Sequence, residues 1–400
     1  MFQTRRGLWR LLVLLMAAML VMAACGDDDD DDGAGAGQED GDKQAVAIGF
    51  VGPLTGPNAN LGINIRDGIK VAIEEANEES DAYTYELKEY DTQGDPAQAP
   101  GQKDKYIPDE SIIGLVGPTF SGETRAVIPD LEQAGLVMVS ASATAVDIPD
   151  VVPGAKVFHR IVPDDDVQAQ AITDYVTQVI KPQKVALLHD NTDYGKGLWE
   201  GVVSRLTDAG VDAGTTDAID PRSQDYSAAV NRVKAANVDL IFYGGYYNEA
   251  GRLKKQLTDA GVEARFVSGD GSLDPGFVQQ SGAAGGEGAL LTCACRLATP
   301  DLEGEAGEFA TKYEETIGKA PGTYSSEGYD AAKLLIQAIE EGNDTREALL
   351  EYIEGLESYE GVSKTIEFED NGNIGAGDVF VYEVKEGKIT ELGTTSELAA

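Results

Sequence analysis

The chain has 400 residues, and its 31 basic and 70 acidic side chains give a formal net charge of −39 at pH 7. A protein this acidic is repelled by phosphate backbones, so nucleic acid is excluded as an expected partner. Apolar residues make up 42% of the chain and charged residues 25%, which is typical of a globular protein. With 2 histidines and 3 cysteines, the chain is expected to hold no metal site, and no cofactor is expected either. At ~100–200 residues per domain, the length favours two domains.

The first 24 residues have the layout of a secretory signal peptide. A basic start precedes the apolar run 11–21, which is shorter than the ~20 residues that span a bilayer. Small residues then precede Cys25, an ending that resembles a bacterial lipobox, in which the cysteine is lipidated and becomes the new N-terminus. Plain secretion is the alternative, and paired arginines leave twin-arginine export open. Residues 25–43, rich in Asp and Gly, predict a solvated tether. We therefore expect an extracytoplasmic protein that is anchored to the membrane only by lipid on Cys25, or is periplasmic.

Beyond the tether, short apolar runs that end in Gly or Pro alternate with segments of helical period, which predicts an α/β protein. Near-continuous apolar strands are typical of parallel sheets buried on both faces. The strands are too many for one open sheet, so two sheets are expected. The predicted strands are 45–52, 83–90, 112–117, 136–139, 184–188, 240–243, 264–267, 289–293, 363–369 and 379–384. The predicted helices are 65–76, 122–134, 167–179, 197–209, 226–236, 250–260, 302–317 and 329–340.

Five strand-end sequences occur in a characteristic order. They are GPLTGP at 52–57, GPTFSG at 117–122, SASAT at 140–144, HDNTDYGKG at 189–197 and YGGY at 243–246. Together they resemble the substrate-binding proteins of branched-chain amino acid ABC transporters, the leucine/isoleucine/valine-binding protein family with the type I periplasmic binding fold. The resemblance covers nearly all of the chain after the tether.

The resemblance implies two doubly wound lobes with mostly parallel sheets, joined by three crossovers near Pro163, Ala294 and Gly375. The first lobe would comprise residues 44–163 and 295–374, and the second residues 164–294 and 375–392. Ligand would bind in the inter-lobe cleft, which closes like a hinge. In open α/β sheets, ligands bind at the carboxyl ends of strands, which favours the same cleft.

Ser121 begins a predicted helix, where its hydroxyl and nearby free N–H groups can hold a carboxylate or only cap the helix. In the family the matching serine binds the ligand carboxylate, aided by the threonine that corresponds to Thr144. The position of Ser142 offers a backbone carbonyl to the ligand ammonium, and Ala143 lies in the same ligand-binding loop.

Asp270 follows a predicted strand and matches the acidic residue that pairs with the ligand ammonium in the family. A plain turn aspartate is the alternative. Tyr194 and Tyr246 match aromatic pocket positions of the second lobe. Without the resemblance, each would be interpreted as a buried core tyrosine with its hydroxyl satisfied.

Leu61, Phe120 and Tyr324 match the side-chain pocket positions of the first lobe. None of them is charged, and a buried unpaired charge is costly, so an apolar ligand side chain is implied. Leu61 and Phe120 differ from the tyrosine and the small residue that are common at these two positions.

Cys293 and Cys295 flank Ala294 on a predicted strand. Residues two apart on a strand share a face, and two thiols this close can oxidise outside the cytoplasm. The ring would be small, so a disulfide and free thiols both remain open. The family's first-lobe disulfide is expected to be absent, because Gly94 and Phe120 occupy its positions.

We therefore expect a monomeric solute-binding lipoprotein that delivers an aliphatic L-amino acid to ABC permease subunits. No catalytic residues are predicted, because the chain has no Gly-x-Ser-x-Gly elbow, no phosphate-binding loop and no histidine beside a nucleophile. Two alternatives remain open. One is the ligand-binding component of a sensor, and the other is a protein that binds an amide or another small organic solute for uptake.

Overall fold

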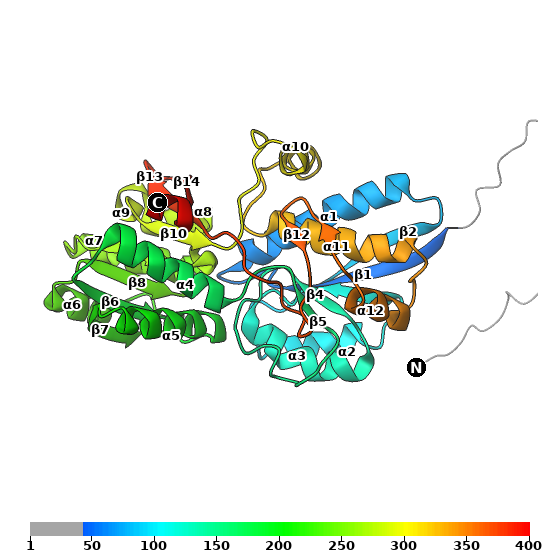
Figure 1. The fold of residues 1–400 in the computed structure, drawn as a ribbon, viewed down its shortest axis with the longest axis horizontal. Coiled ribbons are helices and arrows are strands. Elements are labelled where there is room, and N and C mark those ends of the chain that lie inside the picture. The colour runs from blue at the N-terminus through cyan, green and yellow to red at the C-terminus, as the bar shows by residue number, and fades with distance from the viewer. Residues whose placement is uncertain (1–42) are drawn as a thin grey trace, which may run out of the picture. The chain divides into compact units, whose positions relative to one another are not determined.

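The computed structural model describes residues 43–400 (Figure 1). The predicted signal peptide, Cys25 and all of the tether except Lys43 lie outside the described residues. Within the described part, every helix is too short or too polar to cross a bilayer.

The first lobe is built on a five-stranded sheet in the order β2-β1-β3-β4-β5, and all of its strands are parallel. Its strands are β1 (Gln44–Gly52), β2 (Tyr83–Asp91), β3 (Ile112–Val116), β4 (Met138–Ser140) and β5 (Phe158–Arg160). Every residue of β3 and β4 is buried, as expected of strands covered on both faces. Its helices are α1 (Ala59–Glu79), α2 (Ala99–Tyr106), α3 (Ser121–Ala134), α10 (Glu305–Ile317), α11 (Ser325–Glu340) and α12 (Arg346–Glu354).

Helices α1 and α11 lie side by side on one face of this sheet although they are far apart in the sequence (Figure 1). Their backbones approach closely at Gly328, where a Cβ atom would stand 2.5 Å from the carbonyl oxygen of Ile65. Because only glycine permits this approach, α11 packs closely against α1 in the first lobe although the two helices are far apart in the chain.

The second lobe is built on a seven-stranded sheet in the order β14-β13-β10-β9-β8-β6-β7. Its strands are β6 (Lys184–His189), β7 (Asp212–Ala218), β8 (Leu240–Gly244), β9 (Arg265–Ser268), β10 (Leu290–Cys293), β13 (Phe380–Lys385) and β14 (Lys388–Thr394). Strands β6 to β10 pair in parallel, whereas β13 and β14 are antiparallel additions at one edge. Its helices are α4 (Asp165–Tyr175), which continues as the π-helical turn η1 (Val176–Ile180), α5 (Asp193–Asp208), α6 (Ser227–Ala236), α7 (Tyr247–Asp259), the 3-10 turn η2 (Asp270–Ser272), α8 (Pro275–Ser281), α9 (Ala283–Gly286) and α13 (Thr395–Ala399).

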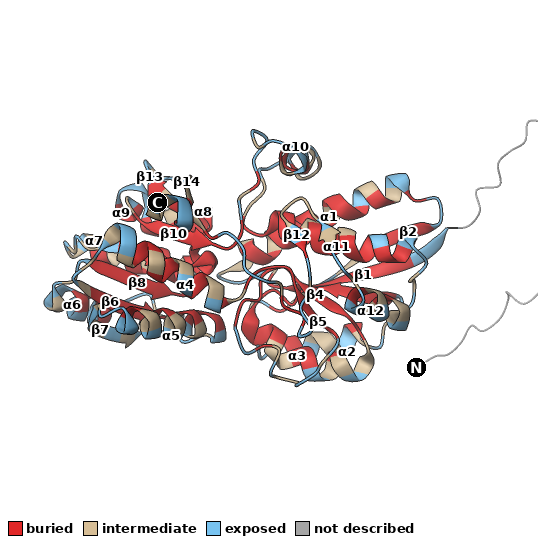
Figure 2. Ribbon diagram, viewed as in Figure 1, coloured by how far each residue is buried: buried red, intermediate tan, exposed pale blue. Residues whose placement is uncertain are grey.

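The central strands of both sheets are buried, the edge strands β2, β7 and β14 are partly exposed, and most helices bury one face and expose the other (Figure 2). Helices α4 and α5 each start at a side-chain cap. Asp164 accepts hydrogen bonds from the backbone N–H groups of Asp166 and Val167 at the start of α4, and the Thr192 hydroxyl accepts from Gly195 N at the start of α5. Such caps satisfy N–H groups that the helix itself leaves free.

The chain passes between the two sheets three times: after β5, after β10 and before β13. Two mostly parallel sheets with three crossovers were predicted, and the prediction is confirmed. Several local predictions were wrong. The predicted strand 363–369 is reduced to β12 (Thr365–Ile366), which pairs only with β11 (Tyr359–Glu360). The edge strands β7 and β14 were not predicted. Each is partly exposed, so its sequence lacks the apolar run that indicates a buried strand.

Candidate functional site

A small cavity lies between the two lobes. Its lining residues are Leu61, Phe120, Ser121, Ser142, Tyr194, Tyr246, Asp270, Gly271 and Tyr324. They come from loops and helix starts that follow the carboxyl ends of strands in both sheets, together with α1 and the start of α11. The structure thus brings together all the predicted ligand-binding residues except Ala143 and Thr144, which are buried and do not line the cavity. Gly271 lines the cavity and was not predicted.

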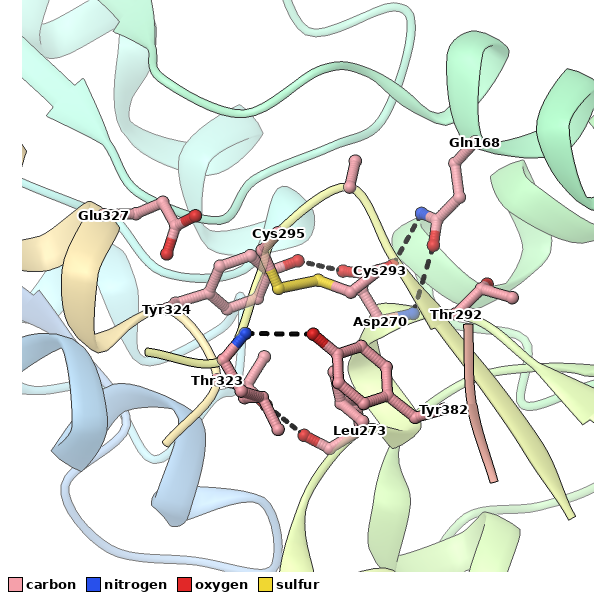
Figure 3. The surroundings of a disulfide bond; sticks show 12 residues. Gln168, Asp270, Leu273, Thr292, Cys293, Cys295, Thr323, Tyr324, Glu327 and Tyr382 are labelled. Carbon is pink, nitrogen blue, oxygen red and sulfur yellow. Dashed lines mark hydrogen bonds between the residues drawn. A yellow bond between two sulfur atoms is a disulfide. The ribbon is translucent and has the colours of Figure 1, made fainter. Parts of the chain in front are cut away.

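The Asp270 carboxylate is the polar centre of this cavity. Its Oδ1 atom accepts hydrogen bonds from the Tyr194 hydroxyl at 2.8 Å and from Gln168 Nε2 at 2.6 Å. Its Oδ2 atom accepts a bond from the hydroxyl of Tyr324, which belongs to the first lobe (Figure 3). These donors hold the carboxylate in one orientation, and the bond from Tyr324 joins the two lobes across the cleft.

A second buried carboxyl, Asp165, lies beside Asp270 and was not predicted from the sequence. Gln168 Nε2 also donates to Asp165 Oδ1, at 3.2 Å. Burial raises the pKa of Asp165 well above its ordinary value, and the negative charge of Asp270 raises it further. Burial also raises the pKa of Asp270, although the hydrogen bonds from Tyr324, Gln168 and Tyr194 oppose the shift. Two adjacent buried carboxyls cannot both ionise cheaply, so this pair is suited to receive a cation.

A signal for Asp165 existed in the sequence. It stands three residues before Gln168 in the first turn of α4, a spacing that puts both side chains on one face of the helix. No signal in the sequence places that face of the helix beside Asp270.

Ser121 lines the cavity from the first lobe, at the first position of α3. Its Oγ atom accepts a hydrogen bond from Ala145 N at 3.1 Å, which leaves the hydroxyl hydrogen available to donate. The first N–H groups of a helix have no partner inside it and carry the positive end of the helix dipole. The start of α3 is therefore suited to a carboxylate.

Arg160 shapes the loop that carries Ser142. Its side chain is 0% exposed, and Nη1 donates to the carbonyl oxygens of Ala143 at 3.1 Å and Ala145 at 2.9 Å. The carbonyl of Thr144 accepts from Asp165 N at 2.8 Å. The carbonyl groups of Ala143 and Thr144 are therefore hydrogen-bonded inside the protein, whereas Ser142 lines the cavity.

The remaining wall of the cavity is apolar and aromatic. Leu61 and Phe120 contribute from the first lobe and Tyr246 from the second. The Phe120 and Tyr246 rings have centroids 4.4 Å apart, and Tyr246 lies 5.1 Å from the ring of Tyr194. No charged side chain belongs to this part of the wall.

Further contacts close the lobes around the cavity. Asn60 Nδ2 donates to Asp274 Oδ1 at 2.8 Å, and the Asn60 backbone N–H donates to the Tyr247 hydroxyl at 3.3 Å. Asn58 Nδ2 donates to Glu249 Oε2 at 3.3 Å. The cleft is therefore in a closed form, with direct bonds between lobes outside the cavity.

Cys293 and Cys295 are joined in a disulfide at the second crossover, and both residues are buried. Asp270 and Tyr324 are among the residues that surround it (Figure 3). A larger cavity of about 860 Å³ lies on the crossovers themselves, with Arg296, Lys364 and Glu303 among its lining residues. Its charged walls are mostly exposed, and it lacks the converging buried hydroxyls and carboxyls of the inter-lobe cavity. Within residues 43–400, no group of three or more His, Cys, Asp or Glu side chains is placed to hold a metal ion.

Residues 45–388 match the family model described as periplasmic binding protein. The Leu/Ile/Val-binding protein BraC3 of Rhizobium johnstonii is 29% identical over 349 residues, which cover 86% of this chain and 93% of that protein. A leucine-, isoleucine-, valine-, threonine- and alanine-binding protein of Pseudomonas aeruginosa is 27% identical over 342 residues, covering 84% of this chain and 89% of the other.

Among solved structures, the branched-chain amino acid transporter substrate-binding protein LivJ of Streptococcus pneumoniae, in complex with isoleucine, matches with a TM-score of 0.81. Its identity is 24%, and the match covers 88% of this chain and 100% of that one. The predicted two-lobed fold is thereby confirmed, as is the resemblance seen in the strand-end sequences. Because the family model spans most of its length, this chain belongs to the periplasmic binding protein family.

Proposed function

We propose that this protein captures an aliphatic L-amino acid of the branched-chain type outside the cytoplasm and delivers it to an ABC permease. One observation carries the proposal: a single closed cavity combines an anionic end at Asp270, an anion-binding end at Ser121 and an uncharged apolar wall. A zwitterion with an apolar side chain supplies the matching groups. The names of the relatives support the same ligand class.

The two lobes divide the recognition of the ligand. The first lobe supplies Ser121 and the second supplies Asp270, so a bound amino acid contacts both. A ligand that binds the closed form better than the open form shifts the population toward closure. The closed form then serves as the signal that a permease recognises. Binding, rather than catalysis, is the activity proposed for this site.

The proposal includes the predicted organisation of the chain. Signal residues 1–24 are removed, Cys25 is lipidated, and the monomeric binding protein is held by the tether. The first lobe comprises residues 44–163 and 295–374, and the second residues 164–294 and 375–392. Passage of the chain between the sheets after β5, after β10 and before β13 supports these boundaries. Metabolic labelling of the full chain with radioactive palmitate, compared with Cys25→Ala, tests the anchor, because label in both forms or in neither contradicts it.

The ligand class is tested by thermal unfolding of residues 41–400, refolded to remove co-purified ligand. A ligand that binds only the folded state raises the midpoint according to RT ln(1 + [L]/Kd). We expect a rise with aliphatic L-amino acids. We expect none with 4-methylpentanoate, which lacks the ammonium of leucine, or with 3-methylbutylamine, which lacks its carboxylate.

Each of these two compounds removes one charged end and keeps the aliphatic chain, so each tests one end of the cavity. A midpoint that rises only with amides, sugars or organic acids would contradict the amino-acid proposal and favour another solute. If no compound raises the midpoint, the result supports neither uptake of an amino acid nor uptake of another solute, and the site has to be reassigned.

A further inference from the structure

We infer that the two lobes cap one another's helices across the cleft, and that this contact sets how tightly every ligand binds without selecting among ligands. We call the contact the interlobe cap. It consists of Asn58 and Asn60 of the first lobe and Tyr247, Asn248, Glu249 and Asp274 of the second. None of these residues lines the inter-lobe cavity. The inference rests on the proposed function, because it concerns closure of the lobes around a bound ligand.

One helix in each lobe begins without a cap from its own chain. Helix α1 follows Asn58 and helix α7 follows Tyr246, and neither side chain accepts a hydrogen bond from the helix that it precedes. The case of Asn58 is informative, because asparagine is among the residues that cap helices most often at this position. The first N–H groups of each helix have no partner inside the helix and need acceptors from elsewhere.

The opposite lobe supplies these acceptors. Asn58 Oδ1 accepts a hydrogen bond at 3.4 Å from the backbone N–H of Asn248, the second residue of α7. In return, the backbone N–H of Asn60, the second residue of α1, donates to the Tyr247 hydroxyl at 3.3 Å. The side chain of Asn58 thus caps a helix of the second lobe, and a tyrosine of the second lobe caps the helix that follows Asn58.

Two buried carboxyl groups of the second lobe complete the interlobe cap. Asn58 Nδ2 donates to Glu249 Oε2 at 3.3 Å, and Asn60 Nδ2 donates to Asp274 Oδ1 at 2.8 Å. Asp274 Oδ1 also accepts from Gly276 N at 2.7 Å, at the start of α8. Glu249 is 1% exposed and Asp274 is 2% exposed. Carboxyl groups buried this deeply need hydrogen-bond donors, and the first lobe provides one for each.

Each half of the interlobe cap is held in place by its own lobe. In the loop that leads to Asn58, Asp91 accepts hydrogen bonds from Leu54 N at 2.9 Å and from Thr55 Oγ1 at 2.6 Å. On the other side, Tyr247 packs so closely on Gly276 that a Cβ atom there would stand 2.4 Å from Tyr247 Cε2. Groups that are already ordered lose little entropy when they pair, so these bonds favour closure.

The interlobe cap acts on affinity through the closing equilibrium. When the lobes part, its bonds are lost together and the same groups bind water instead. One net hydrogen bond shifts an equilibrium by about two- to tenfold. A ligand that bridges both lobes needs the closed form, so less favourable closure weakens the binding of every such ligand by the same factor. A change in the cavity wall would instead affect different ligands unequally.

The test is isothermal calorimetry of residues 41–400 with L-leucine, L-isoleucine and L-valine. We expect the Kd to rise about tenfold in Asn58→Ala, which loses two bonds across the cleft, and about threefold in Tyr247→Phe, which loses one. Within each variant, the factor should be the same for every amino acid that the wild-type protein binds. If Asn58→Ala does not fold, Tyr247→Phe still decides the question, because it removes only a hydroxyl.

The matched control is Asn77→Ala. Asn77 also belongs to α1, but its side chain bonds within the first lobe, where Nδ2 donates to the Tyr85 carbonyl at 3.0 Å and Oδ1 accepts from Tyr85 N at 2.7 Å. Its substitution should lower the melting temperature of the ligand-free protein and leave every Kd unchanged.

Unchanged Kd values in both cap variants would overturn the inference, and so would factors that differ clearly from one amino acid to another. A loss of affinity in Asn77→Ala as large as that in Asn58→Ala would overturn it too, because the effect would then come from the stability of the fold. These outcomes leave the proposed function intact, whereas a wild-type protein that binds no amino acid contradicts the function and the inference together.

Discussion

Asp165 and Asp270 both accept a hydrogen bond from the same nitrogen atom, Nε2 of Gln168, at 3.2 Å and 2.6 Å. Asp165 is 1% exposed and Asp270 is 3% exposed. The neutral side-chain amide of Gln168 fixes the positions of both carboxyl groups, but it does not neutralise their negative charge. Asp270 lines the cavity, so under the proposed function a ligand ammonium at Asp270 supplies a positive charge next to the pair.

We expect ligand binding to release protons and to tighten as pH rises. In the free protein, burial raises the pKa values of both carboxyls above 3.8, and a bound ammonium favours their ionised forms. Affinity therefore increases as pH rises through the pKa values of the free pair. Calorimetry at pH 5.5 in two buffers of different ionisation enthalpy measures the protons released.

Asp165→Asn removes one member of the pair and should reduce the proton release. Equal heats in the two buffers, corrected for dilution, together with an affinity that is constant from pH 4.5 to 8, would contradict the role of the pair.

Ser121→Ala and Asp270→Ala should each weaken amino-acid binding by about 1–3 kcal/mol, because each leaves one charged end of the ligand short of a partner. Calorimetry gives the two affinities directly. Ser227→Ala is the control, since Ser227 also occupies the first position of a helix, α6, but lies outside the cavity. If both site variants bind as the wild-type protein does, the site is misplaced.

Arg160→Lys should weaken ligand binding about tenfold, because a lysine ammonium cannot reproduce the planar geometry that holds the Ala143 and Ala145 carbonyls. Arg346 provides a matched control. It also donates to backbone carbonyls, at 2.8 Å to Ile112, 3.0 Å to Ile107 and 2.8 Å to Asp109, away from the cavity.

Arg346→Lys should lower the melting temperature and leave the affinity unchanged. An Arg160→Lys protein that loses stability while its affinity stays at the wild-type value would show that Arg160 serves the fold alone.

Replacing Cys293 and Cys295 by serine should lower the free energy of unfolding by about 1.5 kcal/mol, a small value because the bridge joins residues only two apart in sequence. Urea unfolding of the oxidised wild-type protein and the double variant measures this difference. We expect ligand affinity to change less than threefold, because neither cysteine lines the cavity. A tenfold loss of affinity would instead show that the bridge positions its neighbour Asp270.

The stability of the folded protein should decline between about pH 4.5 and about pH 7 through Glu123. Burial raises the pKa of this carboxyl from 4.5 to about 7. The folded state then binds more protons than the unfolded state within this range, so the free energy of unfolding falls as pH rises. One such group contributes about 1–3 kcal/mol.

Glu123→Gln keeps an oxygen acceptor for the Phe120 N–H group, which donates to Glu123 Oε2 at 2.9 Å, and removes the titration. Urea unfolding at pH 5 and pH 7.5 should therefore show a smaller pH dependence in this variant. Glu263→Gln, at an exposed position, should behave as the wild-type protein does. An unchanged pH dependence in Glu123→Gln would contradict the assignment.

Much of the architecture was predictable because its signals are local. Buried parallel strands such as β3 and β8 are uninterrupted apolar runs, and each is followed by a glycine-containing turn that starts a helix. Ligands bind at the carboxyl ends of strands in open α/β sheets, so with two facing sheets Ser121 on one and Asp270 on the other were expected at the cleft between them. The resemblance then added Leu61 and Tyr324, whose positions after long helical or irregular segments have no local signature.

Only the tertiary structure decided which side chains act on one another. Asp165 and Gln168 lie beside Asp270 because the first crossover turns the start of α4 toward it, and no periodicity in the sequence indicates that turn. The contact between Phe120 and Tyr246 joins two lobes, so it depends on closure of the cleft. The sequence by itself determined the buried central strands and the turns that follow them, since these depend on residues near one another in the chain. The paired carboxyls and the contact between Phe120 and Tyr246 depend on distances between distant segments, which packing alone determines.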